Sequence, residues 1–477
     1  MERITLFDSL LIDDIPDVSM LAPLFSDCNW NHVYMILEKH WDDFMGSLNG
    51  NETEAYFKKD VTYFHNMEEA ATYFERNADV YLPRQIVSDR DDMIRARLLE
   101  IHKRRLERDV CPGQPFISVC IPSYNRGTQA LRAVETLLSM NYDVEMEIIV
   151  SNNGSTQNLD GYRKIQEMKD SRIRYFAFEE NQGYATNVRQ VLAMARGVWA
   201  VLESDEDTVL SESFDEYLNY LLNNQDAGVV FTQGKGPNFA AATPQAYTDK
   251  MDTVFMTMNS NYITGITYNM QELNTQNAIA RFDANRGNTY LEYYTHCALA
   301  LFACEDKMAK KAGICLWDAH ESVASVRQDS QKLDEIQAYA TLESRLEQFR
   351  AKVKVLRNMC HLERDIVAEV ILEEVQRVYH LQAVVYWYRP KAYEKQYNWL
   401  DVCKEIFRES CHVLNENIDI FGEVMERARD ILMNFFFEYG RNEEVLSGMS
   451  PQRKQRHLQA MDELECQFKL GTWPDEC

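Results

Sequence analysis

The sequence predicts an α/β protein whose largely parallel sheet is flanked along the chain by two helical regions. Between about residues 116 and 231, short apolar runs alternate with amphipathic helical patterns, which is typical of βαβ units. Aromatic-rich helical patterns precede this stretch, and long helical patterns follow it. We therefore expect an N-terminal helical region over residues 1–112, an α/β domain over 113–330 and a C-terminal helical domain over 331–477.

Four apolar runs define the central strands. We expect strands over residues 116–121, 147–150, 173–178 and 198–202, with helices between them. The loops that follow these strands are polar. In open α/β sheets, ligands bind at the edge formed by the carboxyl ends of the strands. We therefore expect the functional site in these loops.

The N-terminal region is rich in helical patterns. We expect helices over Trp30–Met45 and Met67–Arg76, and a basic helix over Arg95–Asp109, where six Lys and Arg residues oppose three acids. A basic run of this kind is usually a solvated helix face, and a phosphate-facing or partner-facing patch is the alternative.

The C-terminal region predicts long helices. Apolar residues over 346–356 are spaced as in a helix seam, and further helices are expected over 366–388 and 402–439. We expect this domain to be an assembly module through which the chain forms a homo-oligomer.

Composition excludes several classes of protein. The 477 residues carry 50 Lys and Arg against 75 Asp and Glu, a net charge of -25, which argues against binding to nucleic acid or to an anionic membrane. The N-terminus lacks the pattern of a secretory signal, and no apolar run reaches the roughly 18 residues of a membrane span. The 11 cysteines include no CxxC pair. We expect a cytoplasmic protein with reduced thiols and no transmembrane segment.

Three carboxylates at alternate positions follow the fourth strand. In an extended chain Glu203, Asp205 and Asp207 point to the same side. Like charges crowded on one side are costly unless a cation neutralises them, and Mg²⁺ or Mn²⁺ prefers such oxygen ligands. The sequence therefore predicts a divalent metal site here, with a solvated acidic turn as the alternative.

Two further loops supply polar groups to the same edge. Residues 122–126 follow the first strand and 152–156 follow the second, and together they offer amides, backbone N–H groups and the guanidinium of Arg126. Amides can read a nucleotide base and ribose, while Arg126 and a metal ion neutralise a diphosphate.

These motifs, in this order, resemble glycosyltransferase family 2, whose members have the GT-A fold. The resemblance covers roughly residues 116–327. The matching stretches are the first strand and loop at Val119–Arg126, an Asp-Asp-Gly-Ser-like loop at Asn152–Thr156, the stretches Glu180–Gly183 with Asn187 and Ala195–Gly197, and a DxD-like motif at Glu203–Asp207.

The resemblance implies a doubly wound mixed sheet of GT-A type and an inverting, metal-dependent sugar transfer. A nucleotide-sugar, most simply a UDP-sugar, would be the donor, and a hydroxyl group of a glycan, a lipid-linked molecule or a protein would be the acceptor. The metal would be Mn²⁺ or Mg²⁺, held by Asp205, Asp207 and Glu203, with His320 as a late ligand. The substrate-binding residues carried over from the family are Pro122, Ser123, Tyr124, Arg126, Asn152, Asn153, Asn181, Gly183, Asn187, Ser204 and Asp205.

Two departures from the family pattern bear on the site. Asn152 stands where the family has an acid facing the base, so base preference can differ. The DxD motif aligns either as Glu203–Asp205 or as Asp205–Asp207, and only Asp205 is common to both.

Inverting members of the family use a carboxylate to deprotonate the acceptor hydroxyl. Glu292 is the first candidate, because a rigid apolar helix is expected directly after it, and Asp283 is the second. A solvated acid at a helix start is the alternative for Glu292.

Two other functions stay open at this point. A nucleotidyltransferase shares a similar sheet, although the loop over 122–127 has one glycine and not a glycine-rich phosphate loop. A catalytically degenerate domain that serves as an assembly scaffold is the other, and the substitution at Asn152 favours it while the retained carboxylates argue against it.

Overall fold

The structure is a computed structural model of the whole chain. It describes residues 9–13, 32–40, 60–76, 85–88, 90–109, 114–140, 144–235, 245–246, 249–260, 262–318, 338–388, 390–421, 437, 441, 446 and 449–469. The chain divides into two compact units. Unit 1 contains residues 1–248, 260–277 and 306–322, and unit 2 contains 249–259, 278–305 and 323–477. Two segments expected in the α/β domain, 249–259 and 278–305, thus group with the C-terminal helices.

The N-terminal region contains a parallel sheet, so the prediction of an all-helical region was wrong. Its strands are β1 (Ser9–Asp13), β2 (His32–Ile36), β3 (Asp60–Phe64) and β4 (Gln85–Val87), in the order β3-β2-β1-β4. Strand β2 lies inside the segment expected to be a helix, and its residues from Val33 to Ile36 are buried on both faces. A strand buried on both faces is a continuous apolar run, which periodicity cannot distinguish from a buried helix.

Two helices that the sequence predicts pack on this unexpected small sheet. Helices α3 (Met67–Arg76) and α4 (Asp91–Asp109) share a buried cluster with β1, β2 and β3 that includes Tyr34, Phe74 and Ile101. The basic run lies on α4, where Arg97 and Arg104 form ion pairs with acids of α3 and of α4 itself. These pairs favour the solvated-face interpretation of the run.

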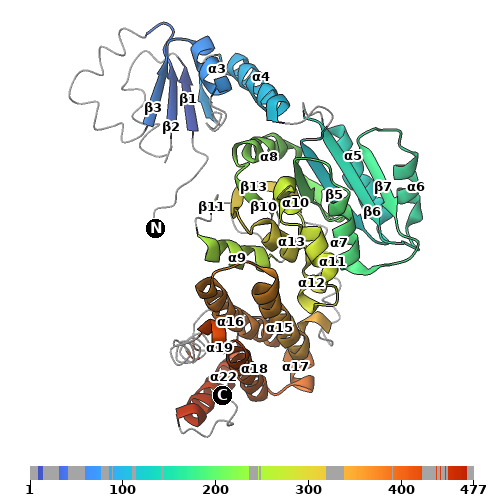
Figure 1. Cartoon of the computed structure of the whole chain (residues 1–477), viewed down its shortest axis with the longest axis vertical. Coiled ribbons are helices and arrows are strands. Elements are labelled where there is room, and N and C mark those ends of the chain that lie inside the picture. Colours follow the sequence, from blue (N-terminus) through green and yellow to red (C-terminus); the bar gives the residue numbers. More distant parts are fainter. Residues whose placement is uncertain are drawn as a thin grey trace, which may run out of the picture. The chain divides into compact units, whose positions relative to one another are not determined.

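The central sheet has nine strands and is mixed, in agreement with the expected fold class (Figure 1). Its order is β11-β13-β10-β12-β8-β5-β6-β7, and β9 pairs with β13. Strands β5, β6, β7 and β8 are mutually parallel, whereas β12 runs antiparallel between β8 and β10. The strands are β5 (Ile117–Ser123), β6 (Met146–Asn152), β7 (Ile173–Ala177), β8 (Trp199–Leu202), β9 (Thr208–Val209), β10 (Ala227–Lys235), β11 (Gln245–Ala246), β12 (Ile266–Asn269) and β13 (Met308–Asp318).

Helices that connect these strands have buried apolar faces. They are α5 (Gly127–Ser139), α6 (Leu159–Glu167), α7 (Gly183–Ala193), α8 (Ser211–Asn223) and α10 (Met270–Thr275). Helices α5 and α6 touch through their backbones, because a Cβ added at Gly161 would lie 1.9 Å from the carbonyl oxygen of Gly127. This contact brings the start of α6 next to the loop after β5, which belongs to the site.

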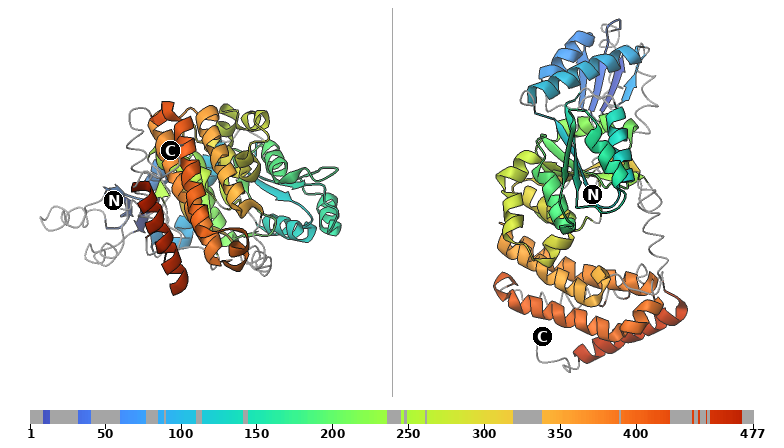
Figure 2. Two further views of the ribbon diagram at one scale, coloured as in Figure 1. Left: turned by 90° about the horizontal axis from the view of Figure 1, so that it is seen from below. Right: turned by 90° about the vertical axis from the view of Figure 1, so that its right-hand side faces the viewer.

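Unit 2 is helical in its described parts. Its helices are α9 (Lys250–Met258), α11 (Ala278–Ala284), α12 (Thr289–Tyr293), α13 (Thr295–Ala303), α15 (Leu342–Met359), α16 (Arg364–Tyr388), α17 (Pro390–Gln396), α18 (Trp399–Glu416), α19 (Ile418–Phe421) and α22 (Pro451–Lys469). The long C-terminal helices lie side by side in Figure 2. The seam residues Leu346, Phe349, Val353 and Leu356 of α15 are buried as predicted. The single helix expected over 402–439 is interrupted, since α18 ends at Glu416 and α19 begins at Ile418.

Within the described ranges, no helix combines the length and the apolar character needed to cross a membrane. The longest apolar run of the sequence, Cys297–Cys304, is almost entirely within α13, and every residue of that helix is buried. This run therefore belongs to the core of unit 2.

Gly161→Ala should destabilise unit 1 by about 1–3 kcal/mol, because the added methyl group overlaps the backbone of α5 and the two helices must separate. Urea unfolding followed by circular dichroism measures this loss. Arg163→Ala, on the same helix but with a side chain that is 67% exposed, should change stability by less than about 0.5 kcal/mol. Equal effects of the two changes would contradict the backbone contact.

Candidate active site

An open pocket of about 350 Å³ lies at the carboxyl ends of β5, β6 and β8 in unit 1. This is the sheet edge at which the sequence predicts the site. Ten of the eleven substrate-binding residues that the resemblance supplies line it, together with two residues that were not predicted. The lining residues are Pro122, Ser123, Tyr124, Arg126, Asn153, Asn181, Gly183, Tyr184, Asn187, Ser204, Asp205 and Ile263.

Asp205 is the carboxylate that lines this pocket. Its side chain is almost fully buried, and Ser123 Oγ donates a hydrogen bond of 2.6 Å to Asp205 Oδ2. Arg126 Nη1 lies 3.4 Å from Asp205 Oδ1, and Arg126 Nη2 lies 2.8 Å from a carboxylate oxygen of Glu206. Burial raises the pKa of Asp205 to about 6, although Ser123 and Arg126 oppose the shift. The pocket therefore holds a carboxylate whose negative charge is incompletely compensated.

Tyr162 of α6 holds the first loop in place. Its hydroxyl group lies 2.6 Å from Ser123 Oγ and accepts a hydrogen bond of 3.0 Å from the backbone N–H of Arg126. Asn125, in a left-handed conformation with φ of 58°, accepts hydrogen bonds from the backbone of Thr156 and Gln157. The loops after β5 and β6 are thus fastened to each other.

Asn153 ties the second loop to the start of α7. Its Nδ2 donates to Asn181 Oδ1 at 2.9 Å and to the carbonyl of Gly183 at 3.0 Å, and its Oδ1 accepts from the backbone N–H of Gln182. The next residue, Gly154, has a φ of 63°, and a Cβ there would lie 2.2 Å from the backbone of Glu180. Only glycine allows the two segments to approach this closely.

Asn187, from the same helix, lines the pocket and is itself buried. Its Oδ1 accepts a hydrogen bond of 2.6 Å from Ser151 Oγ, and its Nδ2 donates to the carbonyl of Ser123 at 3.4 Å. Asn187 therefore joins β5, β6 and α7 at the pocket.

Asn152 points away from the pocket lining. Its Nδ2 donates to the hydroxyl group of Tyr175 at 2.9 Å, and its Oδ1 accepts from the backbone N–H of Ser155 at 3.0 Å. Asn153, and not Asn152, is the residue of this loop that lines the pocket. The base-facing role assigned to Asn152 stays a prediction.

The three alternate carboxylates do not converge on one point. Glu203 and Asp207 are both buried. Burial, and to a smaller extent the charge of Asp207, raises the pKa of Glu203 well above its usual range. The backbone N–H of Asp207 donates to the carbonyl of Ser204 at 3.1 Å, so the chain turns after β8 and the alternation of an extended strand is lost. In the part of the chain that the structure describes, no three His, Cys, Asp or Glu residues are grouped as ligands for one metal ion.

The donor set nevertheless fits a divalent cation that is completed by substrate. Mg²⁺ commonly takes one or two protein carboxylates and fills its remaining positions with water and phosphate oxygens. Asp205 supplies such a carboxylate at the pocket surface, with Ser204 beside it. His320, the predicted late ligand, lies outside the described residues.

Comparison with known proteins identifies the domain that carries this pocket. Residues 118–297 match the model of Glycosyl transferase family 2. This stretch of the chain is similar to glycosyltransferase family 2. The family 2 match includes β5, β6, β7 and β8 with all the residues that line the pocket.

Individual relatives are similar over parts of the chain. Glycosyltransferase GlyG of Streptococcus pneumoniae is 30% identical over 167 residues, which is 35% of this chain and 50% of GlyG. Chondroitin synthase of Pasteurella multocida is 24% identical over 165 residues, which is 34% of this chain and 16% of that enzyme. The match thus spans half or less of the length of these relatives. Among solved structures, S. aureus TarS 1-349 in complex with UDP-GlcNAc has a TM-score of 0.45 and 13% identity, covering 70% of this chain and 93% of TarS 1-349.

The two candidate bases lie on helices of unit 2. Glu292 is on α12, where Arg286 forms an ion pair with both carboxylate oxygens at 2.6 and 3.0 Å and the backbone N–H of Gly287 donates at 3.1 Å. Burial acts to raise the pKa of Glu292, but Arg286 and Gly287 together outweigh it, so the pKa is lowered. Asp283 is exposed on α11. The contacts of Glu292 are also those of an acid that stabilises a helix start, so its catalytic role stays a prediction.

Four residues of the family 2 site were missed from the sequence. Tyr184 and Ile263 line the pocket, Tyr162 binds Ser123, and Thr264 Oγ1 accepts a hydrogen bond of 2.8 Å from the backbone N–H of Ser204. Tyr184 directly follows the Gly183 motif, so its place beside a recognised motif was a usable signal. The other three belong to no motif, and only the folded chain shows that they reach the site.

Asp205→Asn should stabilise the protein at neutral pH in the absence of divalent metal. The folded pKa of Asp205, about 6, lies above its ordinary value of 3.8, so the folded state binds more protons than the unfolded state between these values. Wild-type stability therefore falls as pH rises through about 4 to 6, by up to about 3 kcal/mol, and the amide avoids this loss. Urea midpoints near pH 4 and pH 7.5 should diverge between wild type and variant only at the higher pH.

The matched control for this change is Asp160→Asn, whose carboxylate is 82% exposed and should give the same difference from wild type at both pH values. An Asp205→Asn variant that is no more stable than wild type at neutral pH would contradict the uncompensated charge.

Proposed function

We propose that this protein transfers a sugar from a nucleotide-sugar to a hydroxyl group of an acceptor, with inversion and with Mn²⁺ or Mg²⁺ as cofactor. The observation that carries the proposal is the meeting of Asp205 and Arg126 in one pocket at the carboxyl edge of a family 2 sheet. A carboxylate for a cation and a guanidinium for phosphate oxygens are the two groups that an anionic donor requires at this position.

Different residues of the pocket would bind different parts of the donor. Arg126 faces the diphosphate, and the exposed rings of Tyr124 and Tyr184, 40% and 43% exposed, offer flat surfaces for a base or sugar. The amide groups around Asn181 and Asn153 are fixed by their mutual hydrogen bond and by Gly183, so they are preorganised for a polar ring edge. We favour a UDP-sugar as donor.

The metal ion would be held by Asp205, with Ser204 beside it. When bound, a divalent cation supplies positive charge that offsets the negative charge developing on the diphosphate. Buried Asp207 adds negative charge to this region, whereas burial and the charge of Asp207 raise the pKa of Glu203 and favour its neutral form until a cation binds. Arg126 supplies the remaining positive charge from the chain itself.

The transfer step requires a base on the acceptor side. The acceptor oxygen forms a bond to the anomeric carbon, the bond from that carbon to the diphosphate oxygen breaks, and the nucleoside diphosphate leaves with the electron pair. We propose that Glu292 takes the proton of the acceptor hydroxyl, with Asp283 as the second candidate. Because Arg286 lowers the pKa of Glu292, the carboxylate is ionised at neutral pH, which is the form that a base needs.

The acceptor class is proposed from the names of relatives. One relative is a chondroitin synthase, and another, from Campylobacter jejuni, is a glucosyltransferase named for an undecaprenol-linked glycan. A growing polysaccharide or a lipid-linked glycan is therefore the acceptor we propose. A cytoplasmic location and self-association through the C-terminal helices stay predictions.

Asp205→Asn should lower the turnover of a UDP-sugar by about a hundredfold or more, because the pocket loses the carboxylate that binds the cation. Hydrolysis or transfer of nucleotide-sugars, measured with Mn²⁺ and with EDTA, tests this. Asp160→Asn, on the exposed side of α6, should retain wild-type turnover. Equal rates for wild type and Asp205→Asn, with and without Mn²⁺, would refute the proposed enzyme.

Glu292→Gln should lower transfer by about 10²–10⁴-fold while donor binding is retained, since a general base acts on the acceptor and not on the donor. Arg286→Gln breaks the same ion pair but keeps the carboxylate, so it should retain most activity. Transfer rates together with donor binding by calorimetry separate the two variants. Equal loss in both would assign the pair a structural role and direct attention to Asp283.

A further inference from the structure

Strand β7 forms one edge of the central sheet in unit 1 (Figure 1). Among the described elements, β6 is the one that packs along it. Every residue of β6 is buried, whereas residues 173–176 of β7 are partly exposed and Ala177 is exposed. The side of β7 that faces away from β6 is therefore open to another strand.

The backbone of β7 presents hydrogen-bonding groups at this edge. The carbonyl of Arg172 and the N–H of Phe178 both form hydrogen bonds to β6, of 2.8 and 2.9 Å. Since alternate residues of a strand direct their backbone groups to opposite sides, Tyr175 and Ala177 direct their N–H and C=O groups away from β6. Such an edge is a template on which a further strand can pair.

The side chains of β7 do not protect this edge from pairing. Sheet edges that stay in water usually carry several charges, a proline or a bulge. Residues 173–178 contain no proline, and Arg174 is the one charged residue among them. Arg174 already forms an ion pair of 3.2 Å with buried Glu147 of β6. Phe176 and Phe178 are partly exposed on one face of the strand, with ring centroids 4.8 Å apart, so apolar surface lies at the edge.

The charges at the two ends of β7 favour a second copy of the same strand. Lys169 and Arg172 precede the strand together with one acid, Asp170, whereas the exposed acids Glu179 and Glu180 follow it. In an antiparallel pair of identical strands, the basic end of each copy lies opposite the acidic end of the other. The edge is therefore complementary in charge to its own two-fold copy.

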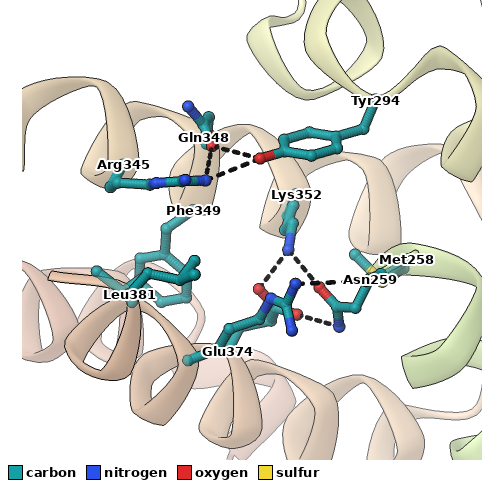
Figure 3. Close-up of a pocket in the computed structure, with 11 residues that line it drawn as sticks. Met258, Asn259, Tyr294, Arg345, Gln348, Phe349, Lys352, Glu374 and Leu381 are labelled. Carbon is teal, nitrogen blue, oxygen red and sulfur yellow. Dashed lines mark hydrogen bonds and ion pairs between the residues drawn. The ribbon is translucent and has the colours of Figure 1, made fainter. Parts of the chain in front are cut away.

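The polar cavity inside unit 2 offers no comparable surface (Figure 3). Lys352 Nζ donates to Asn259 Oδ1 at 2.7 Å and to Glu374 Oε2 at 2.6 Å, and Asn259 Nδ2 donates to Glu374 Oε1 at 2.7 Å. Lys352 and Glu374 are 7% and 1% exposed. The remaining space, about 20 Å³, has room for about one water molecule. These groups therefore bind one another and not a partner.

We propose that the protein forms a two-fold symmetric dimer in which β7 of each copy pairs antiparallel with β7 of the other. With Phe176 on the axis, Tyr175 of each copy exchanges backbone hydrogen bonds with Ala177 of its partner. The two Phe176 side chains face each other in the neighbouring pair, where side chains lie closest. No residue of β7 lines the donor pocket, so the dimer is independent of the proposed sugar transfer.

Ala177→Pro tests the backbone pairing, because it removes an N–H that points to the partner and none that points to β6. Proline is tolerated on an edge strand when its missing N–H faces outward. The dissociation constant of the dimer, from sedimentation velocity on the full chain, should rise about tenfold or more, since each dimer loses a hydrogen bond at both copies. Ala177→Val keeps the N–H and should dimerise as wild type does. Equal dissociation constants for wild type and Ala177→Pro would overturn the proposal.

Phe176→Lys and Phe176→Glu test the position of the axis, because each places like charges opposite each other. Each variant alone should be monomeric, and a mixture of the two should recover a dimer that contains one copy of each. This recovery distinguishes a lost contact from a lost fold. Tyr339→Lys, at a tyrosine of unit 2 that is 45% exposed, is the control and should remain dimeric.

Three outcomes of the mixing experiment would overturn the β7 dimer. The first is a wild type that is monomeric at every concentration, which would leave the edge to another protein or to water. The second is a mixture of Phe176→Lys and Phe176→Glu that stays monomeric. The third is a dimer lost in Tyr339→Lys but retained in Phe176→Lys, which would place self-association in unit 2.

Discussion

The buried carboxylate of Asp205 is the constraint on which the site depends. Parallel strands place β5, β6 and β8 so that their polar ends meet, and this edge removes Asp205 from water without giving it a full set of partners. Ser123 and the more distant Arg126 compensate only part of the charge. Hydrogen bonds of Tyr162, Asn125 and Asn153 connect the loops around it to one another. The site therefore keeps a buried, partly compensated carboxylate beside a guanidinium, which is the pairing that the proposed metal ion and nucleotide-sugar would use.

The central sheet could be predicted because its buried strands are apolar and the loops after them are polar. Strands β5 to β8 are apolar runs that end in polar loops, and this contrast marks both the strand and its functional end. The N-terminal sheet lacks that contrast, since the apolar stretch of β2 runs from Val33 to Ile36 and is short enough to be either a helical turn or a strand. The arrangement of Glu203 and Asp207 could not be predicted because a single backbone hydrogen bond, from Asp207 to Ser204, replaces an extended chain with a turn.

Motif resemblance located the pocket and most of its lining, but not Tyr162 and Thr264, which hold that lining in place. Resemblance compares positions along the chain and assigns Asn152 to the base, a role that stays a prediction; in the fold its amide donates to the hydroxyl group of Tyr175. Tyr162 and Thr264 carry no pattern of their own, and their roles arise from the proximity of segments that lie 39 and 57 residues from their partners Ser123 and Asp207. Contacts between residues so far apart in the sequence arise only in the folded chain, so local sequence patterns do not predict them.

The reversed direction of β12 has a consequence for how this site can diversify. Because β12 runs antiparallel to β8, its amino end lies at the edge where its neighbours present their carboxyl ends. The segment before β12 therefore borders the pocket through Ile263, while the strand itself is held in the sheet between β8 and β10. Substitutions at Ile263 and Thr264 can change this wall of the pocket without disturbing the register of the strand.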